Sequence, residues 1–203
     1  TYAPGGSMAA VDDIITRVLH ERFRGAELSD LQRAVVARLL AGESLLRSAP
    51  DGWGQDLCWQ IAAVVRGGPV LVIAPLAGDL SRRAEELAVR AGLVACHLDA
   101  ARDPAVADAL CAQIAAGQYE VILASVRQLS DPKVRAAAQA AHPWLMVVEE
   151  ADAATIHGRD YEPATAHIAP LLADLDHPQV LALTEAVDPC ALEALPERLG
   201  ACL

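Results

Sequence analysis

The segment Ala49-Pro50-Asp51-Gly52-Trp53-Gly54-Gln55-Asp56-Leu57-Cys58-Trp59-Gln60-Ile61 decides the fold of this chain. It follows a short apolar run at 44–47 and leads into a stretch, 56–65, whose apolar residues have helical spacing. A glycine-containing turn between a buried strand and a helix is the setting of a phosphate-binding loop, because the N–H groups of a helix N-terminus point at the ligand. The segment therefore predicts a phosphate loop in an α/β protein.

The remainder of the chain alternates in the same manner. Apolar runs bounded by turn residues predict buried parallel strands at 44–47, 70–74, 94–98, 121–124, 145–148 and 180–183. Helical spacing occupies 56–65, 79–90, 104–116 and 165–175, and another helix is predicted from an N-cap at Ser29 to Gly42. Strands that alternate with helices predict a three-layer, doubly wound parallel sheet of six or seven strands, with ligands bound at the C-terminal ends of the strands.

The domain prediction has three parts. Residues 1–7 are interpreted as an expression scar before a start at Met8, residues 8–24 as an added N-terminal helix, and residues 25–203 as one α/β lobe. No linker divides that lobe.

Composition limits the partners that we expect. The formal net charge of −11 argues against a large electrostatic footprint for nucleic acid, and Lys133 is the only lysine. Five cysteines without metal-ligand spacing indicate reduced thiols in a cytoplasmic protein. No apolar run approaches the ~18 residues of a membrane span, so no membrane role is expected.

The tail Leu57-Cys58-Trp59-Gln60-Ile61 resembles the first motif of RecQ-type DNA helicases, which reads Pro-Thr-Gly-Gly-Gly-Lys-Ser-Leu-Cys-Tyr-Gln-Ile. Further segments match family motifs in the same order: Phe23 with Gln32, Ala74-Pro75-Leu76, Val148-Glu149-Glu150-Ala151-Asp152, the loop with Gly158, Asp160, Tyr161 and Pro163, and Ala182-Leu183-Thr184-Glu185-Ala186. The resemblance covers about 23–199. It implies the first RecA-like (P-loop NTPase-like) lobe of a superfamily-two helicase, without the second lobe that closes on ATP.

The resemblance also implies roles for individual residues. Gln32 stands in the adenine-recognition segment, Glu149 at the carboxylate that holds magnesium, and Glu150 at the catalytic carboxylate that orients water. The implied phosphate-loop and nucleic-acid contacts are, respectively, Gly52, Gly54, Gln55 and Asp56, and Arg159 and Tyr161. A second interpretation of Glu149 and Glu150 is that both are inherited remnants without a task.

The phosphate loop departs from the family pattern at four positions. Gln55 replaces the lysine that contacts phosphate, and Asp56 replaces the hydroxyl that holds magnesium. Asp51 replaces a threonine, and Trp53 replaces the glycine where the backbone approaches the phosphates. A like-charge pair at 4 Å costs about 4 kcal/mol at an effective dielectric of 20, so the added carboxylates predict that ATP binds poorly and is not hydrolysed.

Three functions fit these observations. The first is a helicase-like lobe with a degenerate ATP site that binds a protein partner or acts as a scaffold in DNA processing, with no cofactor. The second is an ATP-dependent helicase lobe that a partner chain or a second lobe completes, in which case ATP and magnesium are cofactors. The third is a binder of single-stranded nucleic acid that does not use ATP. The altered loop favours the first function over the second, and the negative charge favours it over the third.

Overall fold

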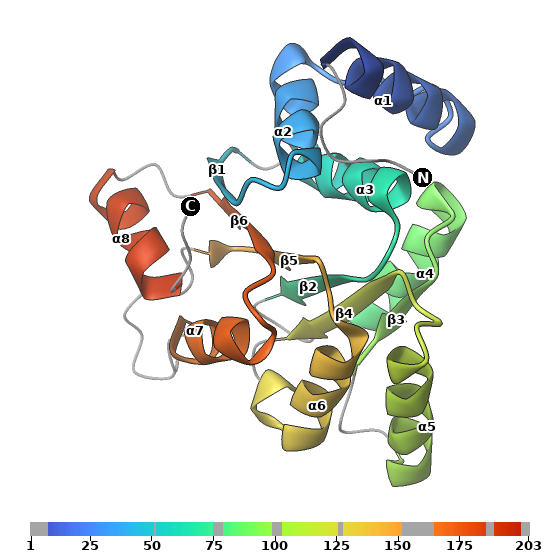
Figure 1. Cartoon of the computed structure of the whole chain (residues 1–203), viewed down its shortest axis with the longest axis vertical. Coiled ribbons are helices and arrows are strands. Elements are labelled where there is room, and N and C mark those ends of the chain that lie inside the picture. The colour runs from blue at the N-terminus through green and yellow to red at the C-terminus, as the bar shows by residue number, and fades with distance from the viewer. Residues whose placement is uncertain are drawn as a thin grey trace.

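A computed structural model describes residues 8–50, 52–74, 79–98, 103–125, 128–151, 165–185 and 189–199. Its six strands form one parallel sheet in the order β1-β6-β5-β2-β4-β3 (Figure 1). The strands are β1 (Leu45–Ser48), β2 (Val70–Ala74), β3 (Ala95–His97), β4 (Val121–Ser125), β5 (Leu145–Val148) and β6 (Gln179–Thr184). All six predicted strands are confirmed to within one residue at each end. Four of them, β2, β4, β5 and β6, are buried apolar runs, whereas β1 contains Arg47 and Ser48 and has only Leu45 fully buried.

The helices are α1 (Met8–Arg22), α2 (Asp30–Leu40), α3 (Gln55–Arg66), α4 (Leu80–Ala91), α5 (Pro104–Ala115), α6 (Pro132–Ala141), α7 (Thr165–Asp174) and α8 (Pro189–Leu199), with a 3-10 turn, η1 (Gln128–Ser130). The sequence prediction omitted α6 and α8. Alanine supplies most of the apolar positions of α6, and a proline interrupts α8, so neither shows a strong helical period.

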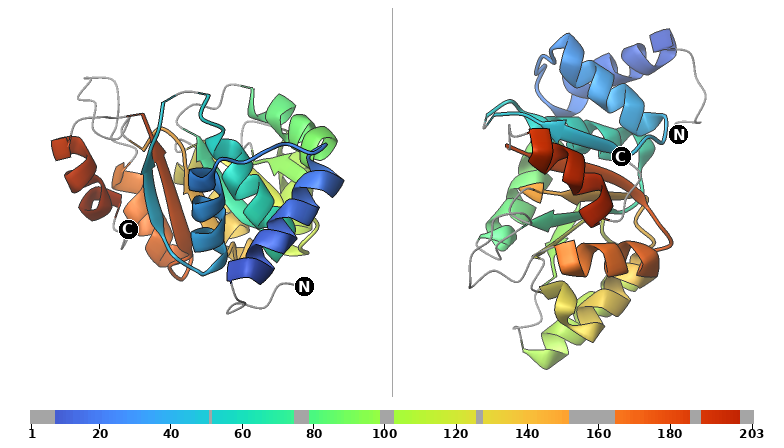
Figure 2. Two further views of the ribbon diagram at one scale, coloured as in Figure 1. Left: turned by 90° about the horizontal axis from the view of Figure 1, so that it is seen from above. Right: turned by 90° about the vertical axis from the view of Figure 1, so that its left-hand side faces the viewer.

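Helices cover both faces of the sheet, which confirms the three-layer prediction (Figure 2). Successive residues of β2 alternate between the two cores: Val70 and Val72 pack with α1 to α4, whereas Leu71 and Ile73 pack with α5 to α8. This alternation follows from the two-residue side-chain period of a strand. Each face of the sheet is therefore a complete apolar core.

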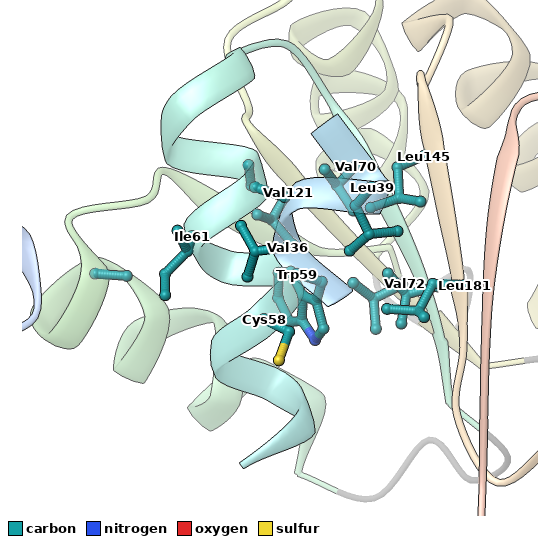
Figure 3. Packing of buried hydrophobic residues seen from close by; sticks show 14 of the residues in the cluster. Val36, Leu39, Cys58, Trp59, Ile61, Val70, Val72, Val121, Leu145 and Leu181 are labelled. Atoms are coloured by element: carbon teal, nitrogen blue, oxygen red, sulfur yellow. The ribbon is translucent and has the colours of Figure 1, made fainter. Parts of the chain in front are cut away.

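Helix α3 is the central helix of the first core. Cys58, Trp59 and Ile61 are at most 1% exposed, and they lie against α2 and the strands (Figure 3). Burial raises the pKa of the Cys58 thiol to about 12. The segment that predicted the fold from sequence thus forms the centre of this core.

No helix in the part of the chain described here is long and apolar enough to cross a bilayer.

Candidate functional site

The loop between β1 and α3 lies at the C-terminal edge of the sheet, as predicted. Strand β1 runs parallel to β6, and α3 begins at Gln55, a few residues after β1 ends. Gly54 is the N-cap of α3 and has a left-handed backbone, φ 80°. The backbone angle favours glycine, and a Cβ atom at Gly54 would lie 2.8 Å from Nε2 of Gln32, so the Gln32 side chain would have to shift to admit it.

Gln32 holds this loop against α2. The Ser29 N–H donates to Oε1 of Gln32 over 2.8 Å, and the Gln32 N–H donates to the Ser29 hydroxyl over 3.3 Å, which together form a capping box. Nε2 of Gln32 donates to the carbonyl oxygen of Trp53 over 2.7 Å. Both ends of the Gln32 amide are therefore engaged within the protein.

Trp53 closes the loop from the other side. Its ring lies 4.7 Å from the guanidinium carbon of Arg47 on β1, a cation–π distance. The backbone N–H of Trp53 donates to the carbonyl oxygen of Pro50 over 3.2 Å. Trp53 is partly buried and packs on the first core, so its side chain has a packing role.

A cavity of about 180 Å³ lies beside the start of α3, at the ends of β5 and β6. Five charged side chains line it: Asp56, Arg83, Glu149, Glu150 and Glu185. Four carboxylates and one guanidinium leave this cavity with three net negative charges when all are ionised. Such a field repels a polyphosphate.

Gln55 and Thr184 also line this cavity. The amide oxygen of Gln55 is buried and has no hydrogen-bond partner among the described residues. The position at which the family has its lysine thus contributes an unpaired acceptor to the site.

Arg83, from the first turn of α4, crosses to two of these carboxylates. Its Nη1 donates to Oε2 of Glu149 over 2.5 Å, and its Nη2 donates to the other oxygen of the same carboxylate. Nη2 also donates to Oδ2 of Asp56 over 3.2 Å. The guanidinium therefore joins Glu149 and Asp56, the residues at the family's two magnesium positions.

Burial decides the electrostatics of this ion pair, since the Glu149 side chain is 15% exposed and the Arg83 side chain 23%. Burial raises the pKa of Glu149 above its ordinary value of 4.5, against the opposing effect of Arg83. Burial also lowers the pKa of Arg83, but the bonds to Glu149 and Asp56 raise it by more. Arg83 therefore stays charged and stabilises a carboxylate that water solvates poorly.

As arranged here, the site does not fit a magnesium ion. Glu149 and Asp56 are engaged by a guanidinium, and within the described ranges no group of three or more His, Cys, Asp or Glu side chains could hold a metal. Glu150 lies beside them with a left-handed backbone, φ 45°. Asp51, Arg159 and Tyr161, which the sequence placed at the loop and at nucleic acid, lie outside the described residues.

Sequence reasoning missed Arg83, although a signal was present. The first turn of α4 contains no acidic residue, yet Arg82 and Arg83 lie close to its start. A cation near a helix N-terminus opposes the helix dipole, so it indicates a partner elsewhere. That turn follows β2 at the edge of the sheet where ligands bind, which is where such a partner was to be sought.

The fold is that of the RecA-like domains of helicases, a parallel sheet with helices on both faces. The structure resembles the hypothetical ATP-dependent RNA helicase from Sulfolobus tokodaii with a TM-score of 0.67 and 14% sequence identity, over 93% of this chain and 54% of that chain. The match at this identity establishes the fold.

The homologues found by sequence are RecQ- and RecS-type ATP-dependent DNA helicases. The chain is 25% identical over 170 residues to the probable ATP-dependent DNA helicase RecS of Bacillus subtilis, covering 84% of this chain and 34% of that protein. It is 23% identical over 171 residues to the ATP-dependent DNA helicase RecQ of the same organism, covering 84% of this chain and 28% of that protein. The chain thus spans about a third of the length of these relatives, and no protein-family model matches it.

Proposed function

We propose that this chain is a helicase-like lobe that no longer uses ATP and that acts as a binding module. The observation that carries the proposal is the bidentate contact of Arg83 with Glu149, extended to Asp56. An intramolecular cation takes the place that a magnesium ion requires. Together with Gln55 at the lysine position, it leaves no free cation described at the cavity to meet a phosphate.

The free energy favours the Arg83–Glu149 ion pair over the binding of magnesium and ATP. To admit magnesium and ATP, Arg83 would have to leave a carboxylate that is 15% exposed, and for this partly exposed pair we expect a cost of about 2 kcal/mol, below the roughly 3–5 kcal/mol of a fully buried pair. ATP would also approach three net negative charges. These two costs act together, because the same carboxylates bind Arg83 and face the cavity.

The relatives are named ATP-dependent DNA helicases, which supports a setting in DNA processing. In that setting the lobe presents a surface to a protein partner. Binding to nucleic acid is expected to be weak, because a net charge of −11 opposes the release of counterions from phosphates.

Calorimetry with ATP and a slowly hydrolysed analogue, with magnesium and with DNA added, tests this function. We expect neither binding nor turnover. Restoring lysine at position 55 (Gln55→Lys) should not produce activity, since Asp56 and the Arg83 pair remain. Micromolar ATP binding that Glu149→Gln abolishes would reject the proposal and would assign the cavity to nucleotide.

A further inference from the structure

A second cavity, of about 580 Å³, opens on the face formed by the turn after α1, the start of α3 and the end of α4. Six of its lining residues carry the argument: Phe23, Arg24, Asp56, Leu57, Val89 and Arg90. We call it the Arg24–Arg90 groove. Its volume lies within the roughly 300–1,000 Å³ that ligand clefts occupy.

The two arginines of the groove differ from six other basic residues of the described ranges. Elsewhere in the described ranges, Arg33, Arg38, Arg82, Arg83, Lys133 and Arg135 each form an ion pair with a carboxylate. Arg24 and Arg90 are exposed and have no carboxylate partner within the residues described. In a chain with 27 acidic and 16 basic residues, two such cations in one groove form a local positive site.

Apolar side chains lie between these cations. Phe23 and Leu57 are partly buried in the first core, and Val89 is 75% exposed. Burial of Val89 by a partner would remove apolar surface from water. The groove therefore offers apolar contact together with two positive charges.

The walls of the groove are fastened to each other. Arg22 at the end of α1 donates from Nε to the carbonyl oxygen of Ala91 over 3.3 Å and from Nη2 to that of Gly92 over 3.1 Å. These bonds cap the last turn of α4 at Ala91 and Gly92, directly after Val89 and Arg90. Since the frame is preformed, a ligand would lose little affinity to ordering it.

We propose that the Arg24–Arg90 groove binds an acidic, apolar peptide segment of a protein partner. Carboxylates of the peptide pair with Arg24 and Arg90, and a Leu or Phe side chain between them covers Val89 and Leu57. The carboxylate of Asp56, which also lines the groove, is bound to Arg83 and so opposes the peptide less. This inference rests on the proposed binding function, for which it names the surface and the chemistry of the partner.

The test uses fluorescein-labelled peptides in which Leu or Phe separates Asp and Glu residues, with matched peptides in which Asn and Gln replace the acids. Fluorescence anisotropy with the whole chain should give micromolar binding of the acidic peptides that weakens with salt. The neutral peptides should bind about tenfold more weakly or worse. If acidic and neutral peptides bind alike, or if neither binds, the proposal is wrong.

Charge-reversal variants locate the site. Arg24→Glu and Arg90→Glu should each weaken the acidic peptide by about tenfold, and together they should abolish its binding. The matched control is Arg17→Glu, which alters an exposed arginine of α1 outside the groove and should change nothing. Thermal melts check that each variant is folded, and equal loss in the control would overturn the assignment.

Two other occupants are excluded by parallel measurements. A labelled single-stranded DNA that binds through Arg24 and Arg90 while the peptides do not would overturn the proposal. So would a dimer that the double variant dissociates in analytical ultracentrifugation.

The titrations are repeated with magnesium and ATP to separate the two proposals. If ATP binds the chain, the proposed function fails. If ATP has no effect and the peptides do not bind, only the groove inference fails.

Discussion

The first turn of α3 lies at the candidate site, whereas the turns that follow it lie inside the apolar core. In the first turn, Gln55 and Asp56 differ from the residues that phosphate binding requires, and Asp56 pairs with Arg83. In the next turns, Cys58, Trp59 and Ile61 resemble the helicase motif and are buried. One helix thus contributes both to the apolar core and to the candidate site.

If the buried residues of α3 pack the fold, a substitution among them should lower the stability of the protein more than one at the site. Trp59→Ala should lower the free energy of unfolding by about 3–5 kcal/mol, because Trp59 is 0% exposed and its removal leaves a cavity. Urea denaturation measures the loss. Gln60→Ala, at the next position of the same helix and only partly buried, is the control and should cost much less. Equal losses would break the comparison.

Arg83→Gln tests the first turn of α3, because Arg83 lies on α4 and pairs with Asp56 in that turn. We expect a loss of about 2 kcal/mol at neutral pH, below the cost of breaking a fully buried pair, because Arg83 is 23% exposed. The control is Arg82→Gln on the same helix. The side chain of Arg82 is 61% exposed, so the loss of its ion pairs with Asp79 and Glu86 in this variant should leave the midpoint of urea unfolding unchanged.

The pH dependence of that variant tests whether Arg83 acts through Glu149. The pKa of Glu149 is raised in the folded protein, and Arg83 opposes the rise, so Arg83→Gln should raise it further. A raised carboxyl pKa means that the folded state binds more protons than the unfolded state. Stability then falls as the pH rises from about 4.5 through the folded pKa. The variant should therefore match the parent best in acid and differ more toward neutral pH, and a constant difference would contradict the mechanism.

Sequence alone predicted the sheet because most of its strands are apolar runs, a local property of the chain. It also predicted the N-cap residue Ser29 and the position of the loop before α3. It could not show the contact of Arg83 with Glu149, since the two are 66 residues apart and meet only when β2 and β5 pair. The pairing of Gln32 with Trp53 was hidden for the same reason, because 21 residues separate the two.

The junction between the two regions is Gly54. Gly54→Ala should lower stability by about 1–2 kcal/mol, because a left-handed angle of 80° is costly for alanine and the new Cβ would meet Gln32. Adding Gln32→Ala should recover part of the Gly54→Ala loss, since it removes the atom at 2.8 Å. A thermodynamic cycle of the two single variants and the double variant measures this coupling. Strictly additive losses would show that only the backbone angle matters.

The smallest expected effect concerns Gln55, which stands where the family has lysine. Its amide oxygen is buried without a hydrogen-bond partner in the described structure, and an unpaired buried acceptor carries a desolvation cost of roughly 1–3 kcal/mol. Gln55→Met replaces the amide with an apolar group of similar length. It should therefore be neutral or stabilise the protein by up to about 1 kcal/mol, since part of the cost is recovered. Gln60→Met, on the same helix but with no such buried atom, is the matched control and should not stabilise the protein.

If Gln55 instead supports a bound phosphate, Gln55→Met should reduce the stabilisation that ATP gives to the protein. Melting curves with and without ATP separate the two cases, because only the second predicts a difference between them.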